Sequence, residues 1–225
     1  MVRRFVDQGA RVHFCDLDAA VGKDLQGELG DHAHFRRVDL TREKQLRSWI
    51  DRVAQQEASI DVLINNAARD PRIALTEMTT KQWDAVFALN IRAFIIAVQQ
   101  SVPHMPPTGG AIINFSSITH HLSPAEMSAY VSTKSGIIGL TRSLARELGP
   151  QNIRVNTLSP GWIMTERQLE QFVTPQVKRM LKKQQCIADL IQPDEIANVA
   201  LFLASSASAA ITGQELLADR GWAHS

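Results

Sequence analysis

Tyr130 and Lys134 are the residues whose types and spacing most directly permit chemistry. They are four positions apart, so on a helix they lie on one face, one turn above the other. A free phenol has a pKa near ~10, and a cation within about 4–6 Å lowers that value. We therefore expect Lys134 to lower the pKa of Tyr130, the one tyrosine of the chain, and to make it a proton carrier at neutral pH.

Two serines, Ser116 and Ser117, follow a short apolar segment that is typical of a buried strand. Ligands in open α/β sheets gather at the carboxyl ends of strands, so one of these hydroxyls is expected to contact a substrate. Each feature also has an ordinary explanation, because a tyrosine can pack over a lysine stem and serines can form a turn or a cap. Their combination, in this order and before an apolar helix, favours a catalytic site.

The composition is that of a globular domain, with 225 residues of which 44% are hydrophobic. Lysine and arginine number 24 against 23 acidic residues, which gives no electrostatic reason to expect nucleic acid or a membrane as partner. No apolar run of about 18 residues and no signal peptide stand out, so we expect no transmembrane helix and a cytoplasmic protein. Cys15 and Cys186 are expected to be reduced, and no metal site is predicted.

Strand-like and helix-like segments alternate along the chain. A helix tail at 2–8 comes first, a second helix ends at about residue 29, and Thr41 is expected to cap the third. Further helices are expected at 81–101, 129–148 and 194–203, and strands at 11–15, 34–38, 60–65, 111–116, 154–158 and 215–218. This alternation predicts an α/β fold with a doubly wound, Rossmann-like parallel sheet in a single domain, residues 1–225.

Acidic residues end the first two expected strands. In a dinucleotide-binding sheet, an acidic residue in the place of Asp16 accepts hydrogen bonds from the adenosine ribose and repels a 2′-phosphate, which favours NAD over NADP. Alternatively, Asp16 caps the next helix, and Asp39 either contacts the adenine or forms a turn. Asn66, Ala67 and Ala68 follow the next strand, and small side chains there let the backbone approach a ligand.

Six motifs occur in one order along the chain: Asp39-Leu40-Thr41, Asn65-Asn66-Ala67-Ala68, Leu89-Asn90, Phe115-Ser116-Ser117, Tyr130-Val131-Ser132-Thr133-Lys134 and Ser159-Pro160-Gly161-Trp162. With these motifs the sequence resembles the short-chain dehydrogenase/reductase family over its whole length. The resemblance implies oxidoreductase activity with NAD. It also implies a homodimer or homotetramer through helices 81–101 and 129–148, where the apolar surface of Phe94, Ile95, Ile138 and Leu144 is equally consistent with packing on the sheet.

The resemblance implies a catalytic group of Asn90, Ser117, Tyr130 and Lys134. In this family Tyr130, as phenolate, would take the proton of a substrate hydroxyl while a hydride leaves the same carbon for the nicotinamide. Lys134 would lower the tyrosine pKa and bind the nicotinamide ribose. Ser117, which the family spacing favours over Ser116, would position the reacting oxygen, and Asn90 would hold a water that links Lys134 to solvent.

The same resemblance implies the residues that contact NAD: Asp16, Asp39, Leu40, Asn66, Ala67, Ala68, Tyr130, Lys134, Pro160, Gly161, Ile163 and Thr165. The segment 160–165 is expected to lie over the nicotinamide amide. Residues 166–191 are expected to form exposed helices that partly cover the substrate as a mobile lid.

A narrower resemblance, to bacterial NAD-dependent aldose 1-dehydrogenases, rests on segments 65–70, 117–122, 160–162, 167–168 and 173–175. Those enzymes oxidise xylose, arabinose, fucose or galactose to the lactone, which implies a sugar, or another secondary alcohol, as the small-molecule substrate. A sugar pocket needs several hydrogen-bonding side chains, and the candidates are His120, Glu126, Trp162 and Gln168.

Two departures from the family pattern stand out. The family has a first strand and a Gly-rich turn that faces the cofactor pyrophosphate, about 20 positions before the acidic residue, and counting back from Asp16 passes the start of the chain. We therefore expect an N-terminally truncated fold with unpaired strand edges and weak NAD binding, either because the start is misplaced or because the sheet has closed. Arg220 stands where the family usually has glycine and is expected to alter a turn. A non-catalytic remnant that acts as a binding or assembly partner is thus the alternative to a sugar dehydrogenase.

Overall fold

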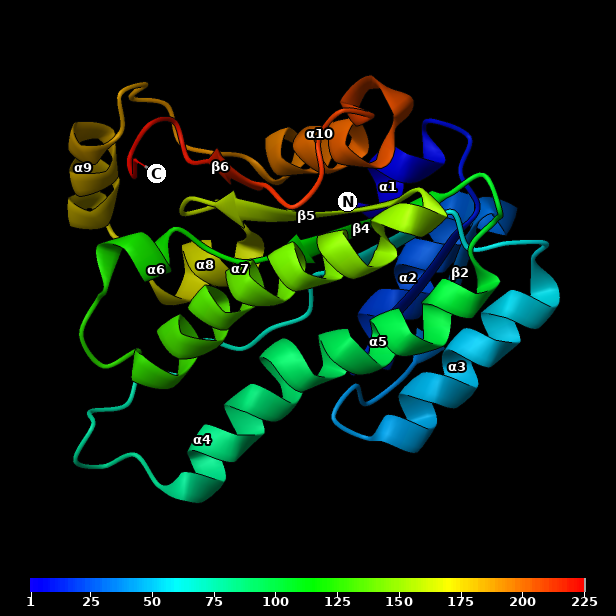
Figure 1. Cartoon of the computed structure of the whole chain (residues 1–225). Coiled ribbons are helices and arrows are strands. Elements are labelled where there is room, and N and C mark those ends of the chain that lie inside the picture. Colours follow the sequence, from blue (N-terminus) through cyan, green and yellow to red (C-terminus); the bar gives the residue numbers. More distant parts are fainter. Residues whose placement is uncertain (225) are drawn as a thin grey trace.

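Two parallel sheets, where one was expected, run through the structure, a computed structural model that describes residues 1–224 (Figure 1). β1 (Val12–Asp16) pairs with β2 (Ala33–Arg37). The second sheet has the order β3-β4-β5-β6, with bounds β3 Val62–Asn65, β4 Gly110–Phe115, β5 Ile153–Pro160 and β6 Glu215–Ala218. The α/β class and the parallel pairing are confirmed. Within residues 1–224 no strand joins β1 to β3, the place where a doubly wound sheet has a central strand.

Helices cover both faces of the strands (Figure 1). α5 (Ala93–Ser101) and α7 (Ser128–Leu148) lie on one face, with α3 (Glu43–Gln56) packed on α5. α1 (Val2–Val6) and α10 (Pro193–Ala204) lie on the other face. The remaining helices are α2 Ala19–Leu29, α4 Thr80–Phe87, α6 Thr119–Leu122, α8 Glu166–Gln171 and α9 Pro175–Gln184.

The expected helix at 81–101 is interrupted. One π-helical turn, Ala88–Arg92, separates α4 from α5, and such turns are frequent at functional sites. The helical segment Thr80–His104 has a mean hydropathy of 1.5 in its most apolar window and is long and apolar enough to cross a membrane by length and composition alone. The core helix of a water-soluble protein passes the same test, and α5 packs on α3 through Ala93, Ile96 and Ala97 in just such a way.

Local hydrogen bonds decide two capping questions. Thr41 does not cap α3, because its backbone N–H and its hydroxyl both donate to Asp39 Oδ1, at 2.9 and 2.6 Å. Asp18, and not Asp16, caps α2 by accepting the N–H groups of residues 20 and 21. Asp16 Oδ1 instead accepts the N–H of Asp18 at 3.0 Å, and its side chain stays exposed at the carboxyl end of β1.

Arg220 adopts a backbone conformation that favours glycine. Its φ is 59° and that of Gly221 is 76°, so the family's two glycines correspond to two left-handed residues here. The Arg220 guanidinium donates to Glu195 Oε1 at 2.7 Å, and the Asp219 carboxylate accepts the N–H groups of Gly221 and Ala223. These bonds hold the turn in the conformation that the missing glycine would adopt freely. Cys15 and Cys186 are both free thiols, as expected.

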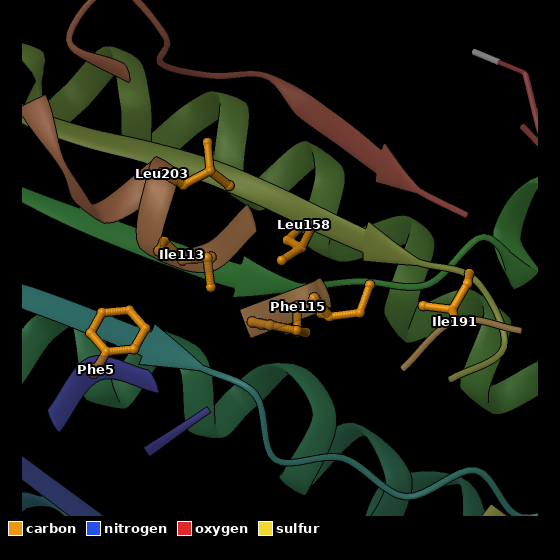
Figure 2. Packing of buried hydrophobic residues seen from close by; sticks show 8 residues of the cluster. Phe5, Ile113, Phe115, Leu158, Ile191 and Leu203 are labelled. Atoms are coloured by element: carbon orange, nitrogen blue, oxygen red, sulfur yellow. The ribbon is translucent and has the colours of Figure 1, made fainter. Parts of the chain in front are cut away.

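Side chains connect the two sheets where backbone hydrogen bonds do not. Phe5 of α1 lies beside β3 in a buried cluster with Ile113 and Leu203 (Figure 2). Val12 of β1 and Val62 of β3 pack against this same cluster. The ring of Phe5 therefore lies at the junction between the sheets.

Replacement of Phe5 tests this junction. The side chain is only 8% exposed, so Phe5→Ala should lower the free energy of unfolding by about 3–5 kcal/mol, measured by urea denaturation. Phe202→Ala is the control, since that ring is 39% exposed and should cost less than about 1 kcal/mol. Equal losses in the two variants would show that Phe5 does not connect the sheets.

Candidate active site

Tyr130 and Lys134 lie together near the start of α7, as their spacing predicts. Lys134 Nζ is 5.5 Å from the centre of the Tyr130 ring. The lysine is only 2% exposed, and Nζ donates a hydrogen bond of 2.7 Å to the carbonyl oxygen of Phe115, the last residue of β4. The side chain of Lys134 therefore joins α7 to the carboxyl end of a central strand.

Burial, rather than the charge of Lys134, controls both acid–base groups. It raises the pKa of Tyr130 to about 12 and lowers the pKa of Lys134 to about 7. The expectation that Lys134 brings the Tyr130 pKa toward neutrality is therefore wrong in this structure. A hydrogen bond with Ser117 and the charge of Arg167 lower the Tyr130 pKa, but not enough to offset burial and the charge of Asp70.

The two serines after β4 have different partners. Ser116 Oγ donates to the carbonyl oxygen of Lys134 at 2.8 Å, so this hydroxyl holds α7 against the strand. Ser117 hydrogen-bonds the Tyr130 side chain, and its Oγ accepts the N–H of Thr119 at 3.3 Å. The structure thus brings Ser117, and not Ser116, to the phenol.

Asn90 is fully buried in the π-helical turn. Its Oδ1 accepts the N–H of Arg69, and its Nδ2 donates to the Arg69 carbonyl, both at 3.0 Å. Nδ2 also lies 3.2 Å from Thr133 Oγ1, which donates to the Tyr130 carbonyl at 2.7 Å. Asn90 therefore fastens the loop after β3 to the helix that carries the phenol.

A buried chain of polar side chains, which sequence reasoning missed, fixes α7 over the sheet. Asn65 Nδ2 donates to Asn114 Oδ1, Asn114 Nδ2 donates to Thr141 Oγ1, and Thr157 Oγ1 donates to Thr141 Oγ1, at 2.9, 3.0 and 2.8 Å. Asn65 and Asn114 occupy matching positions of paired strands. In the sequence, the feature that could have revealed this chain is an asparagine near the end of each of two apolar strands.

A cavity of about 500 Å³ lies beside the loop that Asn90 holds, and its lining includes Asp70, Arg72, Arg167 and Phe172. Arg167 Nη2 donates to Asp70 Oδ1 at 2.8 Å, and the Arg72 guanidinium lies 4.3 Å from the centre of the Phe172 ring. Asp70 and Arg167 also act electrostatically on the pKa of Tyr130, so the cavity lies within electrostatic range of the phenol. Its volume suits a small-molecule ligand.

Comparison with known proteins identifies the family. A family model described as enoyl-(acyl carrier protein) reductase matches residues 1–223. The chain is 41% identical to a probable galactose dehydrogenase of Rhizobium meliloti over 98% of its length and 88% of that protein. It is 37% identical to a D-xylose 1-dehydrogenase of Caulobacter vibrioides, over 97% of this chain and 88% of that one. The chain belongs to the short-chain dehydrogenase/reductase family.

Two further proteins that this chain resembles are also named as dehydrogenases. A mouse L-fucose dehydrogenase is 33% identical over 98% of this chain and 82% of its own. A crystal structure of a gluconate 5-dehydrogenase from Burkholderia cenocepacia, in complex with NADP and tartrate, superposes with a TM-score of 0.88 at 27% identity and covers 98% of this chain and 88% of that one. Members of this family use a nicotinamide cofactor.

Several residues of this chain fit the two ends of such a cofactor. Asp16 exposes a carboxylate at the end of β1, and Asn66, Ala67 and Ala68 lie in the loop after β3. Gly161 is packed tightly, since a Cβ there would lie 2.9 Å from Ile191 Cδ1. Along residues 1–224 no Gly-rich turn is present to receive the pyrophosphate.

Other predicted cofactor contacts have protein partners of their own. The Asp39 carboxylate is bonded within its turn, and Leu40 packs against the cluster between α3 and α5. Pro160 ends β5, and Ile163 pairs with Ile191. The Thr165 hydroxyl accepts the N–H of Gln168 at 3.3 Å as the cap of α8.

The four predicted substrate residues lie in three different surroundings: Trp162 and Gln168 contact each other, and Glu126 and His120 each have other neighbours. Trp162 Nε1 donates to Gln168 Oε1 at 2.8 Å, and the Arg72 guanidinium lies 5.8 Å from the centre of the Trp162 ring. Glu126 is exposed in a left-handed turn with a φ of 62°. His120 turns one ring nitrogen to the Ser117 carbonyl and the other to Glu215, so both of its nitrogens face protein groups.

Burial of Lys134 predicts a pH dependence of stability. Its pKa is about 7 in the folded chain against an ordinary value of 10.5 for a solvated lysine, so between these values the unfolded chain binds more protons. The Lys134 contribution to the free energy of unfolding should therefore rise from pH 7 to pH 9, by up to about 1.4 kcal/mol per pH unit, and be lost as pH falls through 7. Lys134→Met should remove that rise in urea denaturation at pH 7, 8 and 9, and an unchanged slope would contradict it.

Proposed function

We propose that this chain is an NAD-dependent dehydrogenase that removes a hydride from C1 of an aldose and releases the lactone. One observation carries the proposal: Tyr130, Ser117 and Lys134 meet at the carboxyl end of β4, and Asp70 and Arg167, which act on the pKa of Tyr130, line a cavity of about 500 Å³. The relatives named for galactose, xylose and fucose support a sugar as substrate.

NAD would supply a hydride acceptor with a positive charge. In this proposal Ser117 orients the sugar hydroxyl and Tyr130 takes its proton. With a pKa of about 12 the phenol holds its own proton at neutral pH, so base catalysis requires a nearby positive charge that lowers this value. Lys134, whose pKa of about 7 lets it exchange protons at neutral pH, passes the proton on, and Asn90 holds the surrounding backbone in place.

The proposed sugar site uses the predicted residues in two ways. Trp162 and Gln168, which are hydrogen-bonded to each other, and Glu126 contribute side chains around the sugar ring. His120 acts through Ser117, whose carbonyl oxygen it contacts. Helix α8, in the segment expected to be a lid, borders the cavity through Arg167, and Phe172, which directly follows α8, borders it as well.

The proposal also covers the domain organisation, the cellular location and the oligomeric state. We infer that residues 1–225 form one catalytic domain of a cytoplasmic enzyme that works as a homodimer or homotetramer. Ile95, which is 39% exposed on α5, is available to a partner copy, whereas Phe94 and Ile138 are 2% and 9% exposed and serve the core of this chain.

Tyr130→Phe tests the chemistry, because it removes one hydroxyl and keeps the ring. The variant should lose about 10²–10⁴-fold in kcat for NAD reduction by galactose, xylose, arabinose or fucose, with little change in NAD affinity measured by calorimetry. Activity equal to that of the unchanged chain would refute the mechanism. An unchanged chain that binds NAD but is inert toward every aldose would refute the substrate.

Asp16→Asn tests the cofactor preference. The exposed carboxylate at the end of β1 should repel a 2′-phosphate, so the unchanged chain should prefer NAD. The variant should raise the ratio of kcat/KM for NADP to that for NAD by at least about tenfold. Asp18→Asn, two residues on in the same turn, is the control and should leave the ratio unchanged. A preference of the unchanged chain for NADP would contradict the assignment.

A non-catalytic binding or assembly role is the second candidate. It is favoured by the gap between β1 and β3 and by the lack of a phosphate-binding turn within residues 1–224. Calorimetric titration with NAD separates the two candidates: binding in the micromolar to millimolar range supports the enzyme, and no heat at any cofactor concentration supports the second role.

A further inference from the structure

Three side chains that take no direct part in the proposed hydride transfer meet next to the Ser117 backbone. His120 and His121 belong to α6, and Glu215 begins β6. Nε2 of His120 lies 3.2 Å from Glu215 Oε1, and Nε2 of His121 lies 3.4 Å from the same oxygen. The three side chains are only 11%, 24% and 10% exposed, so little solvent competes for their polar atoms.

The spacing of these atoms matches that of ligands around one metal ion. Zn²⁺ binds imidazole nitrogen and carboxylate oxygen at about 2.0–2.2 Å with tetrahedral geometry, which places neighbouring ligand atoms about 3.3–3.6 Å apart. The two nitrogen–oxygen separations of 3.2 and 3.4 Å lie close to that value. All three ligand atoms lie within 4.8 Å of one another. An ion can therefore be held with small movements of the side chains.

Outer contacts orient two of the three ligands. His120 Nδ1 lies 2.5 Å from the Ser117 carbonyl oxygen, which can only accept a hydrogen bond. Nδ1 must therefore carry hydrogen. Without a metal, Nε2 faces Glu215 Oε1 as a donor, so a bound ion would replace the Nε2 proton and leave Nδ1–H as the outer hydrogen bond usual for metal-bound histidine. Ser159 Oγ donates to Glu215 Oε1 at 2.6 Å and fixes the carboxylate.

One member of the cluster, Glu215, also lines an open cavity. The volume of this cavity is about 710 Å³, and Phe202, Leu217 and His224 border it as well. This cavity is separate from the one beside Asp70 and Phe172. The cluster therefore borders solvent-accessible space, at Glu215, that is distinct from the proposed sugar site.

We propose that His120 Nε2, His121 Nε2 and Glu215 Oε1 form a site for Zn²⁺ or a similar divalent transition-metal ion, with water as the fourth ligand. The ion connects α6, which begins two residues after Ser117, to strand β6. Its role is structural: it holds the Ser117 carbonyl through His120 and takes no part in hydride transfer. The site stands whether or not the proposed sugar is the substrate.

A second cluster provides the natural control. His13, His34 and Glu57 also bring their ligand atoms within 4.8 Å of one another, between β1, β2 and the end of α3. There, however, Glu57 Oε1 already accepts Arg11 Nη2 at 2.9 Å, and this fixed positive charge opposes a cation. We therefore assign the ion to the cluster next to the Ser117 backbone.

The test uses Co²⁺, whose four-coordinate complexes absorb visible light far more strongly than its six-coordinate ones. The full chain, freed of metal with a chelator, is titrated with Co²⁺ and then with Zn²⁺. We expect intense visible bands that saturate at one ion per chain and disappear when Zn²⁺ displaces the cobalt. His121→Gln should weaken binding at least about tenfold, whereas His34→Gln should leave it unchanged. The weak spectrum of six-coordinate cobalt, or a loss of binding in His34→Gln but not in His121→Gln, overturns the proposal.

Unfolding temperatures, measured with and without Zn²⁺, distinguish the loss of a metal ligand from the misfolding of a variant. Zn²⁺ should raise the Tm of the unchanged chain and of His34→Gln but not that of His121→Gln. Glu215→Gln is the second ligand variant and keeps a group that can accept the Ser159 hydrogen bond. If this variant, folded by circular dichroism, still gains Tm from Zn²⁺ as the unchanged chain does, the assigned carboxylate is wrong.

Discussion

The burial of Lys134 against the end of β4 is the constraint on which the site depends. An ammonium group removed from water is costly unless it is hydrogen-bonded, and Nζ meets this requirement through the Phe115 carbonyl. Ser116 Oγ in turn donates to the Lys134 carbonyl oxygen, so the segment at the end of β4 and helix α7 each donate one hydrogen bond to the other. Once Lys134 is fixed, Tyr130 must stand one turn earlier on the same face of α7, against Ser117.

Further buried polar groups keep this arrangement in register. Asn114 and Thr141 join the sheet to the middle of α7, while Asn90 and Thr133 join the loop at Arg69 to its first turns. In a low-dielectric interior such networks are strong when satisfied and costly when broken. The same burial sets the chemistry, because it raises the pKa of the phenol and lowers that of the ammonium. Position and reactivity therefore have one physical cause.

Sequence patterns predicted those parts of the fold that short-range periodicity controls. Strand Glu215–Ala218 has the expected bounds, and α7 begins one residue before its expected start. The direction of the Tyr130 pKa shift could not be predicted, because it depends on burial, which spacing along a helix does not reveal. Thr41 was misassigned since Asp39, two residues earlier, captures both of its donors. The chain of bonds through Asn114 depends on strand register, which becomes defined only when the sheet forms.

Titration of the phenol tests the account most directly. Tyr130 is the single tyrosine of the chain, so the ultraviolet absorbance of phenolate reports this one group. Burial at the contact with Ser117 and Lys134 predicts a midpoint near 12, and unfolding the chain in urea should return it to 10.0. A midpoint at or below 10.0 in the folded protein would contradict the account, because the phenol would then be solvated or controlled by the lysine charge.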